Sequence, residues 1–421
     1  MPQTKLIIAA FLLPAALGAA VAGSVRGVVH DPQHRPLPAA QVVLHGPVVS
    51  EAKTVQSDLN GEFQFSDIAE GNYRVEISAK GFKPLEQQIT VAADKTPVLH
   101  FQLDLAPLNS SLEVSGLVSR LSPQTSTVQT MVSAEEIAQT PGADQTNSLA
   151  MITDYTPGAY MVHDMLHMRG GHQVNWFFDG IPVINTNIAA NVAPLINPKD
   201  VLELEVERGG YSSEYGDRTY GFFNVVTPSG FERNNEAELV ATAGNFFSTD
   251  DHFSIGSHTQ RFAYYASIDG NRSELGLGTQ VSQVIHDQSS GTGGFLSVLF
   301  NPNAKQQLRW VVSLREDHYQ IPNDQGDQAA GIRDLDLERD YLAGFHWTQT
   351  FADGVVLTLS PYYHYNAAQY LSGPQDTPFV LNDNSRSNYA GARSVLQVQR
   401  KRNDFRGGIE VWGSTTTHSS D

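Results

Sequence analysis

The sequence predicts a mainly β chain in three parts: an N-terminal β-sandwich, a small α+β domain, and the first strands of a transmembrane antiparallel β-barrel. Three patterns predict this fold class. Short alternating segments separated by turn residues fill residues 23–105, glycine-punctuated apolar phrases fill 157–227, and longer alternating segments follow residue 231. After the N-terminal leader no apolar stretch approaches about eighteen residues, so any crossing of a membrane must use strands.

Composition limits the partners of the protein. The 421 residues carry a formal net charge of −18 and include no cysteine. We therefore expect no disulfide framework, and we expect stability to come from packing and strand pairing. The acidic balance argues against a nucleic-acid partner, because the phosphates would be repelled.

Residues 1–22 are expected to be a signal peptide. Lys5 precedes an apolar run from Leu6 to Leu17, and Ala20-Val21-Ala22 has the small-residue pattern of a secretory cleavage site. The run is too short to span a bilayer comfortably. We expect cleavage near Gly23, followed by export of the remaining chain.

Residues 23–105 are predicted to form the β-sandwich, because many short strands with turn residues between them are typical of that fold. The expected strands are Val25–Val29, Gln41–Leu44, Glu62–Phe65, Tyr73–Ile77, Glu86–Val91 and Val98–Leu103. The phrases GSVRGVVHDPQHRPLPAAQVVL and SDLNGEFQFSDIAEGNYRVEISAKGF resemble the carboxypeptidase regulatory-like domain, a transthyretin-like or carbohydrate-binding-like sandwich. Since the stretch has no His-Glu zinc pair and no nucleophile beside a base, we expect no peptidase activity from it.

Residues 106–130 are expected to be a linker rich in serine and threonine. Within this linker, Ser111–Ser115 reads Ser-Leu-Glu-Val-Ser, which is an alternating, strand-like pattern. An extended peptide of this kind can add to the edge of a partner's sheet through backbone hydrogen bonds. An ordinary linker strand explains the same pattern, and both interpretations remain open.

The small α+β domain is expected at residues 131–231. A short helix is predicted over Ser133–Gln139, because its first serine and the glutamate three residues later have the spacing of a capping box. A second helical piece is expected at Asp144–Met151. In Leu202–Glu207 acidic and apolar residues alternate, so a strand would turn them to opposite faces.

The phrases between Pro157 and Thr227 carry the most specific pattern in the sequence. They read PGAYMVHDMLHMRGG, WFFDGIPV and VLELEVERGGYSSEYGDRTYGFFNVVT. In order and spacing they resemble the plug domain of the TonB-dependent outer-membrane receptors. The matching residues are Pro157, Gly158, Arg169, Gly170, Asp179, Gly180, Glu205, Arg208, Gly209, Tyr215, Gly216, Gly221 and Asn224. The sequence departs from the family at Gly210, where proline is usual, and at Gly221, which stands alone where a glycine pair is usual.

The resemblance implies a fold and a set of roles. In that family the plug is a small mixed domain inside a wide barrel, and a short segment before it, the TonB box, adds to the sheet of TonB. The residues at the corresponding place here are Leu112, Glu113, Val114 and Ser115. The resemblance also implies that Glu205 and Arg208 hold the plug to the barrel by polar contacts that can be released. A solvated strand face is the alternative for these residues.

Residues 232–421 are predicted to be the N-terminal part of the outer-membrane barrel. Alternation over about ten residues, with aromatic residues toward the segment ends, is typical of tilted transmembrane strands. The expected strands lie near Arg261–Asp269, Leu308–Arg315, Tyr341–Thr348, Val355–Tyr365, Asn388–Gln399 and Phe405–Trp412. Asn323–Asp336 and Pro374–Ser387 are expected to be longer extracellular loops.

The number of strands conflicts with a closed receptor barrel. About nine strands fit into the roughly 190 residues after residue 231, whereas a barrel with a plugged lumen has about 22 strands. A barrel of about eight strands closes, but its own side chains fill it and leave no room for a plug. We therefore expect this sequence to be the N-terminal part of a longer receptor, or the product of a truncated gene.

A metal site is an alternative role for the segment that contains His163, His167 and His172. Its histidines are interleaved with methionines, and imidazole and thioether groups suit copper or similar ions. No carboxylate is clearly placed behind these ligands, and packing in the plug or exposure at its outer surface is the simpler explanation. We expect neither a metal nor another cofactor.

No catalytic constellation stands out, so we expect no enzymatic activity. The chain has no cysteine, no Gly-x-Ser-x-Gly elbow, no Gly-Lys-Ser phosphate loop and no His-Glu-x-x-His. Carboxylates are plentiful, but the sequence pairs no two of them as acid and base.

The resemblance implies an outer-membrane, TonB-dependent receptor that takes up a scarce solute when TonB, ExbB and ExbD move the plug. The expected ligand is a small solute, an oligosaccharide or a peptide. The expected barrel contacts outer-membrane lipids, and the N-terminal domain is expected in the periplasm. The alternatives are an adhesin-like envelope protein that binds glycan or protein and is anchored by a barrel, a metal-uptake receptor that uses the His and Met segment, and a truncated, non-transporting remnant.

Overall fold

The computed structural model divides the chain into two compact units, Met1–Ala106 and Pro107–Asp421. The residues it describes are 23–31, 36–46, 52–58, 61–69, 71–91, 98–103, 129–140, 148–154, 156–162, 165–171, 174–184, 196–208, 220–277, 282–303, 305–352, 355–376, 380–400 and 403–420. None of the helices in these ranges combines the length and the apolar character that crossing a membrane requires.

The first unit is a β-sandwich, as the sequence predicts. Its strands are β1 (Gly23–His30), β2 (Gln41–His45), β3 (Ala52–Gln56), β4 (Glu62–Ile68), β5 (Gly71–Ser78), β6 (Leu85–Val91) and β7 (Val98–Gln102). They form one sheet of order β4-β1-β7 and a second of order β3-β2-β5-β6. The alternating apolar side chains of both sheets, such as Val29, Val42 and Phe101, meet in one core. The sequence analysis missed β3, whose side chains are mostly exposed and therefore give little apolar alternation.

The second unit contains an inner sheet of five short strands, which we call the plug sheet. Its strands are β8 (Gln129–Ser133), β11 (Val174–Phe178), β12 (Ile181–Val183), β13 (Glu203–Glu207) and β14 (Gly221–Val226), in the order β12-β11-β14-β13-β8. A separate hairpin pairs β9 (Ala159–Val162) with β10 (Met165–Met168). The expected alternation in β13 is confirmed, because Leu204 and Val206 are fully buried while the three glutamates are partly exposed.

Two helices accompany the plug sheet. Helix α1 (Ala134–Gln139) begins at Ser133, and the predicted capping box with Glu136 is present. Helix α2 spans Ser148–Asp154, so the expected end at Met151 was wrong. The helix continues because Ile152 packs in the core and the Thr153 hydroxyl donates to the Leu149 carbonyl at 2.6 Å.

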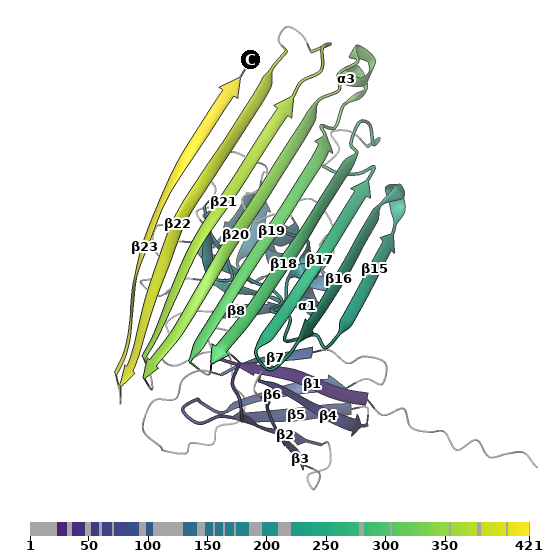
Figure 1. The fold of residues 1–421 in the computed structure, drawn as a ribbon. Helices are drawn as coiled ribbons and strands as arrows, with labels where there is room; N and C mark the ends of the chain where they lie inside the picture. Colours follow the sequence, from purple (N-terminus) through teal and green to yellow (C-terminus); the bar gives the residue numbers. More distant parts are fainter. Residues whose placement is uncertain are drawn as a thin grey trace, which may run out of the picture. The chain divides into compact units, whose positions relative to one another are not determined.

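The remainder of the second unit is a nine-stranded antiparallel sheet, which we call the outer sheet (Figure 1). Its strands are β15 (Glu236–Ala243), β16 (Thr249–His258), β17 (Phe262–Ser273), β18 (Ser289–Asn303), β19 (Gln306–Gln320), β20 (Leu335–Ala352), β21 (Val355–Leu371), β22 (Asn382–Arg400) and β23 (Asn403–Ser420). Each strand pairs with its neighbours in the sequence, and within the described residues the sheet does not close on itself. The expected number of strands is confirmed.

The strands of the outer sheet are longer than the apolar alternation predicted. Strands β20 and β22 begin at Leu335 and Asn382, inside the two segments expected to be extracellular loops. The first of those segments also contains helix α3 (Gln325–Ala330). At the start of β22 polar residues occupy both faces, so the apolar signal there is absent although the strand has begun.

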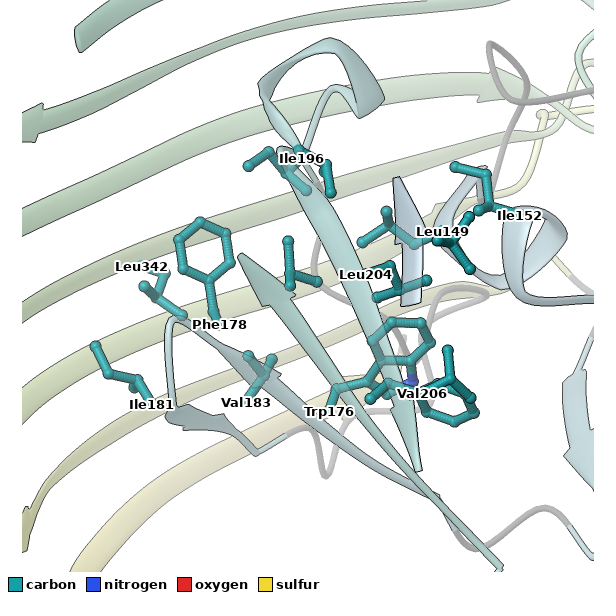
Figure 2. Packing of buried hydrophobic residues seen from close by; sticks show 14 of the residues in the cluster. Leu149, Ile152, Trp176, Phe178, Ile181, Val183, Ile196, Leu204, Val206 and Leu342 are labelled. Atoms are coloured by element: carbon teal, nitrogen blue, oxygen red, sulfur yellow. The ribbon is translucent and has the colours of Figure 1, made fainter. Parts of the chain in front are cut away.

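One hydrophobic core joins the plug sheet to the outer sheet (Figure 2). Trp176, Phe178 and Leu204 of the plug sheet belong to it, and Val311 and Leu342 enter from the outer sheet. Figure 2 shows Leu342, a residue of β20, close to Phe178. The face of the outer sheet that carries Val311 and Leu342 is therefore its inner face.

Candidate functional site

The contact between the plug sheet and the inner face of the outer sheet is the candidate functional site. Polar contacts there concentrate in two segments of the plug region: the β11–β12 turn at Asp179–Gly180, and Asn197–Asp200, which ends in the short 3-10 helix η1 (Pro198–Asp200). Both segments lie on connections between plug strands, where side chains are free of sheet pairing and can reach a neighbouring wall.

The Asp179–Gly180 turn has φ angles of 48° and 78°, which is the left-handed region that an Asp-Gly pair adopts in a tight hairpin. The Asp179 carboxylate accepts hydrogen bonds from the Thr227 backbone N–H at 2.9 Å and from the Thr227 hydroxyl at 2.5 Å. The Gly180 N–H donates to the Asn224 side chain at 2.9 Å. The turn is thus fixed to the end of β14 before it meets the outer sheet.

Arg309 of β19 binds this turn from the outer sheet. Its Nη2 lies 3.3 Å from the Asp179 carboxylate and donates to the Thr227 hydroxyl at 2.9 Å and to the Thr227 carbonyl at 3.1 Å. Its Nε donates to the Ser297 hydroxyl at 3.2 Å. A buried guanidinium with this many acceptors is a strong, geometrically specific connection.

Two further strands contact the same turn. Arg393 of β22 donates to the Gly180 carbonyl at 2.9 Å and lies over the Phe177 ring. Ile181 fits into a gap at Gly344 of β20, where an added Cβ would lie 2.0 Å from the Ile181 side chain. Three residues in a row therefore contact three different strands of the outer sheet.

The Asn197–Asp200 segment contacts β16 and β17. Asp200 is 1% exposed, and its carboxylate accepts hydrogen bonds from the Tyr265 hydroxyl at 2.8 Å and the Ser267 hydroxyl at 2.7 Å. The Nε2 of His252 lies 2.9 Å from the same carboxylate. Lys199 also forms an ion pair with Asp250. The segment is pre-shaped, because the Asn197 side chain accepts from the Lys199 N–H and caps the following turn.

Arg315 of β19 organises the wall beside this contact. Its guanidinium binds Asp317 on its own strand at 2.8 Å and reaches across β18 to Asp269 of β17 at 2.6 Å. The crossing needs glycine in β18, because a Cβ at Gly291 would lie 2.5 Å from the Arg315 guanidinium and 2.0 Å from the Asp317 carboxylate. Asp269 in turn accepts from Asn197 at 3.1 Å, which links the ion-pair cluster to the plug region.

Gly291→Ala is expected to lower the free energy of unfolding by about 1–3 kcal/mol, because the added methyl group displaces the Arg315 guanidinium from its carboxylates. Chemical unfolding in detergent measures the change. Gly270→Ala is the matched control, since the nearest atom to its added Cβ is 3.8 Å away. Equal stability of the two variants would contradict the role of Gly291.

The residues that carry the plug motif lie mostly within the plug region. Arg169 donates to the Arg208 carbonyl at 3.0 Å, and Arg208 donates to the Pro157 carbonyl and the Thr130 hydroxyl. Glu205 accepts from Asn224 at 2.6 Å. These hydrogen bonds join plug segments to one another, whereas Asp179 extends its contacts to the outer sheet.

The glycines of the motif occupy turns and tight spaces. Gly158 and Gly170 have φ angles of 90° and 94°, in the left-handed region. A Cβ at Gly221 would lie 3.1 Å from the Phe223 ring and 3.2 Å from Met168. Nine candidate residues lie outside the described residues: Gly209, Tyr215 and Gly216 of the motif, the TonB-box candidates Leu112–Ser115, and the metal candidates His163 and His172.

His167, the described member of the histidine set, stacks on Tyr160 across the β9–β10 hairpin, with ring centroids 5.2 Å apart. In the described part of the chain, His, Cys, Asp and Glu side chains form no group of three or more that could hold a metal ion. The geometry at His167 is an aromatic contact.

Burial raises the pKa of the Asp179 carboxyl, while the Arg309 charge and the Thr227 hydrogen bonds act in the opposite direction. Burial likewise raises the pKa of Glu205, and the hydrogen bond from Asn224 opposes that shift. The charge of Arg406 on β23 also favours the ionised form of Glu205. At both carboxyls, burial and the specific donors therefore act on the pKa in opposite directions, and the Asp179 charge adds to the rise at Glu205.

The sequence analysis missed Asn197, Lys199 and Asp200 as contact residues. A local signal existed, because Asn followed by Pro marks the start of a short helix. The sequence analysis also did not identify Arg309, Arg315 and Arg393 as contact residues. Each lies on an alternating strand, and nothing in its sequence neighbourhood indicates which distant carboxylate or carbonyl it meets.

A small plug sheet docked on a wall of long antiparallel strands is a plug-and-barrel type of fold. Family models assign the two domains: residues 24–104 match the carboxypeptidase regulatory-like domain, and residues 120–221 match the TonB-dependent receptor plug domain. The chain therefore carries the plug of the TonB-dependent receptors behind a carboxypeptidase regulatory-like domain, and both predicted resemblances are confirmed.

Individual relatives agree with this assignment. The TonB-dependent transporter Oar of Myxococcus xanthus is 26% identical over 239 residues, which are 54% of this chain and 22% of Oar. The open form of the ferric-catecholate import receptor Fiu from E. coli K12 is similar with a TM-score of 0.55 and 15% identity, covering 70% of this chain and 50% of Fiu. The copper transporter OprC gives a TM-score of 0.57 and 13% identity, covering 70% and 47%. The chain thus spans about a fifth of the curated relative and about half of the solved receptors.

Proposed function

We propose that this protein is a TonB-dependent outer-membrane transporter that takes up a scarce solute when TonB moves the plug. The observation that carries the proposal is the contact of the plug turn Asp179–Ile181 with β19, β20 and β22, together with that of Asp200 with β16 and β17. Hydrogen bonds and ion pairs contribute to both contacts. Polar contacts of this kind can exchange with water when the plug is displaced, which suits a plug that must move and return.

The proposal includes the partners and the orientation. The carboxypeptidase regulatory-like domain lies in the periplasm, TonB with ExbB and ExbD supplies the energy, and the outer sheet contacts outer-membrane lipids. The ligand is a small solute, and no covalent chemistry is performed on it. The import receptor for ferric catecholate and the copper transporter among the similar structures support a scarce, small solute as the class of cargo.

We expect Val114→Pro to weaken binding of the periplasmic domain of TonB at least about tenfold, because proline removes the backbone donor that strand addition requires. Isothermal titration of the full chain with that TonB domain measures the effect. Val114→Ala keeps the donor and should bind as the unchanged protein does, and Val118→Pro tests the neighbouring part of the linker. Unchanged affinity of Val114→Pro would remove Leu112–Ser115 as the docking strand.

A second candidate function is a cell-envelope protein in which the sandwich binds glycan or protein and the barrel is an anchor. The observation in its favour is that the sandwich is a compact unit with its own core. Deletion of Gly23–Leu105 separates the two functions. Solute uptake should largely persist in the deletion variant if the sandwich is accessory, whereas loss of ligand binding in this variant would favour the anchor function.

A further inference from the structure

We propose that the outer face of the outer sheet carries a binding site for the phosphate group of an outer-leaflet lipid, formed by Arg339 and Arg386 on either side of Ala367. The proposal rests on the proposed function, because it requires the outer sheet to lie in the outer membrane. It adds a defined lipid site to that function.

Strand register assigns every side chain of the outer sheet to a face. Residues paired across a ladder share a face, and successive residues along a strand alternate between faces. Val311 and Leu342 point to the plug sheet, so Leu314, which is offset by an odd number of residues from Val311, points outward. Leu314 pairs with Tyr341, and Tyr341 pairs with Tyr365, which places both tyrosines on the outer face.

The outer face is uncharged over most of its height. This region is bounded at one end by the row of paired residues that contains Phe405 and Val398, and at the other end by the row that contains Leu314. Between these two rows, the outward positions of the described strands contain no Asp, Glu, Lys or Arg. Large apolar side chains are exposed there: Phe253, Ile268, Leu296, Trp310, Leu314, Leu359, Tyr363, Leu396, Ile409 and Val411. An apolar band of this kind faces lipid tails.

Charge returns in a single row directly beyond this band. In register, Glu316 of β19 is followed by Arg339 of β20, Ala367 of β21 and Arg386 of β22. Asp251 occupies the same row on β16. The next outward-facing row contains Arg272 on β17 and His318 on β19. When this row is included, the arginines outnumber the acidic residues.

Arg339 and Arg386 form the two sides of the site. Neighbouring strands are about 4.8 Å apart, so arginines on β20 and β22 are about 10 Å apart at the backbone, and both guanidinium groups can reach one phosphate between them. The residue between them is Ala367, whose side chain is short and 8% exposed, so it does not itself separate the two guanidinium groups. Arg339 lies 3.3 Å from Glu316, whereas the exposed Arg386 forms no ion pair with any described residue.

The site lies at the end of the sheet that carries the long connections. Short connections of two or three residues join β16 to β17, β18 to β19, β20 to β21 and β22 to β23. Long connections of ten or more residues join β17 to β18, β19 to β20 and β21 to β22 at the other end of the sheet. Outer-membrane barrels have short turns on the periplasmic side and long loops outside. The arginine row therefore meets the outer leaflet, whose glycolipids carry phosphate groups at the level where the apolar tails end.

Native mass spectrometry of the full chain in detergent tests the proposal with lipid A that bears two phosphates and with the same lipid after enzymatic removal of both. The unchanged protein should bind phosphorylated lipid A at least about tenfold more tightly. Arg339→Gln/Arg386→Gln should abolish this preference. Arg261→Gln, an exposed arginine at the opposite end of β17, is the matched control and should retain it.

Equal binding of the two lipids by the unchanged protein, or a preference retained in the double variant, would overturn the lipid site. Because Arg339 and Arg386 lie on the surface, we expect all variants to have the thermal midpoint of the unchanged protein. Flotation with vesicles of outer-membrane lipids separates the two proposals. Protein that floats without a phosphate preference contradicts the lipid site alone, whereas protein that does not associate with vesicles contradicts the membrane location on which both proposals rest.

Discussion

Asp200→Ala is expected to lower the free energy of unfolding by about 3–5 kcal/mol, because it removes the shared acceptor of three buried donors. Tyr265, Ser267 and His252 would remain in the interior with their hydrogen-bonding groups unmatched. Loss of the Asp200 carboxylate should also weaken the attachment of the plug region to β16 and β17. Urea unfolding measures the stability change, and limited proteolysis of the plug region measures the loosening.

Two variants make this experiment specific. Glu135→Gln removes an exposed carboxylate from α1 and should leave stability within about 0.5 kcal/mol of the unchanged protein. Asp200→Asn retains the shape and one acceptor oxygen, so its loss should be intermediate. A loss in Asp200→Ala no larger than that of the Glu135 variant would mean that the Asn197–Asp200 contact does not hold the plug region.

Arg309→Ala is the second change with a large expected effect, again about 3–5 kcal/mol, because it leaves the buried Asp179 carboxylate without its cation. Arg309→Lys should recover part of the loss, since an ammonium group supplies the charge but not the planar fork that reaches Thr227 and Ser297 together. The measurement is urea unfolding with a double-mutant cycle against Asp179→Asn.

The cycle decides whether the two residues act together. A coupling energy of at least about 1 kcal/mol between the Arg309 and Asp179 substitutions is expected for a buried pair. Additive effects would show that Arg309 stabilises the outer sheet without holding the plug turn. Arg261→Ala, on the exposed turn after β16, serves as the arginine control.

Local chemistry explains which features the sequence could predict. The capping box at Ser133, the Asp179–Gly180 turn and the alternation in β13 each depend on residues within a few positions of one another, and all three are present. The same is true of the nine strands of the outer sheet, because alternation is a property of each strand alone. The overall class of fold followed from these local patterns together with the plug motif.

The contacts of the candidate site depend on distant partners and could not be predicted in the same way. Asp200 meets His252 across 52 positions, and Arg309 meets Thr227 across 82. A glycine inside a strand pattern, such as Gly291, indicates that something approaches closely, but the sequence does not say that an arginine from a neighbouring strand crosses there. Charged residues on alternating strands gain their partners only when the plug sheet is placed against the wall.

The order of the plug sheet has a consequence for amide exchange and for displacement by force. Strand β14 lies between β11 and β13, and all six of its residues are buried, so its amides are the most protected from solvent in this sheet. Among the strands that the structure describes, β8 lies at the edge and pairs with β13 alone. A force applied through the preceding linker therefore acts first on the five-residue ladder between β8 and β13. When this ladder breaks, the other four strands of the plug sheet are still attached to the outer sheet through Arg309 and Arg393.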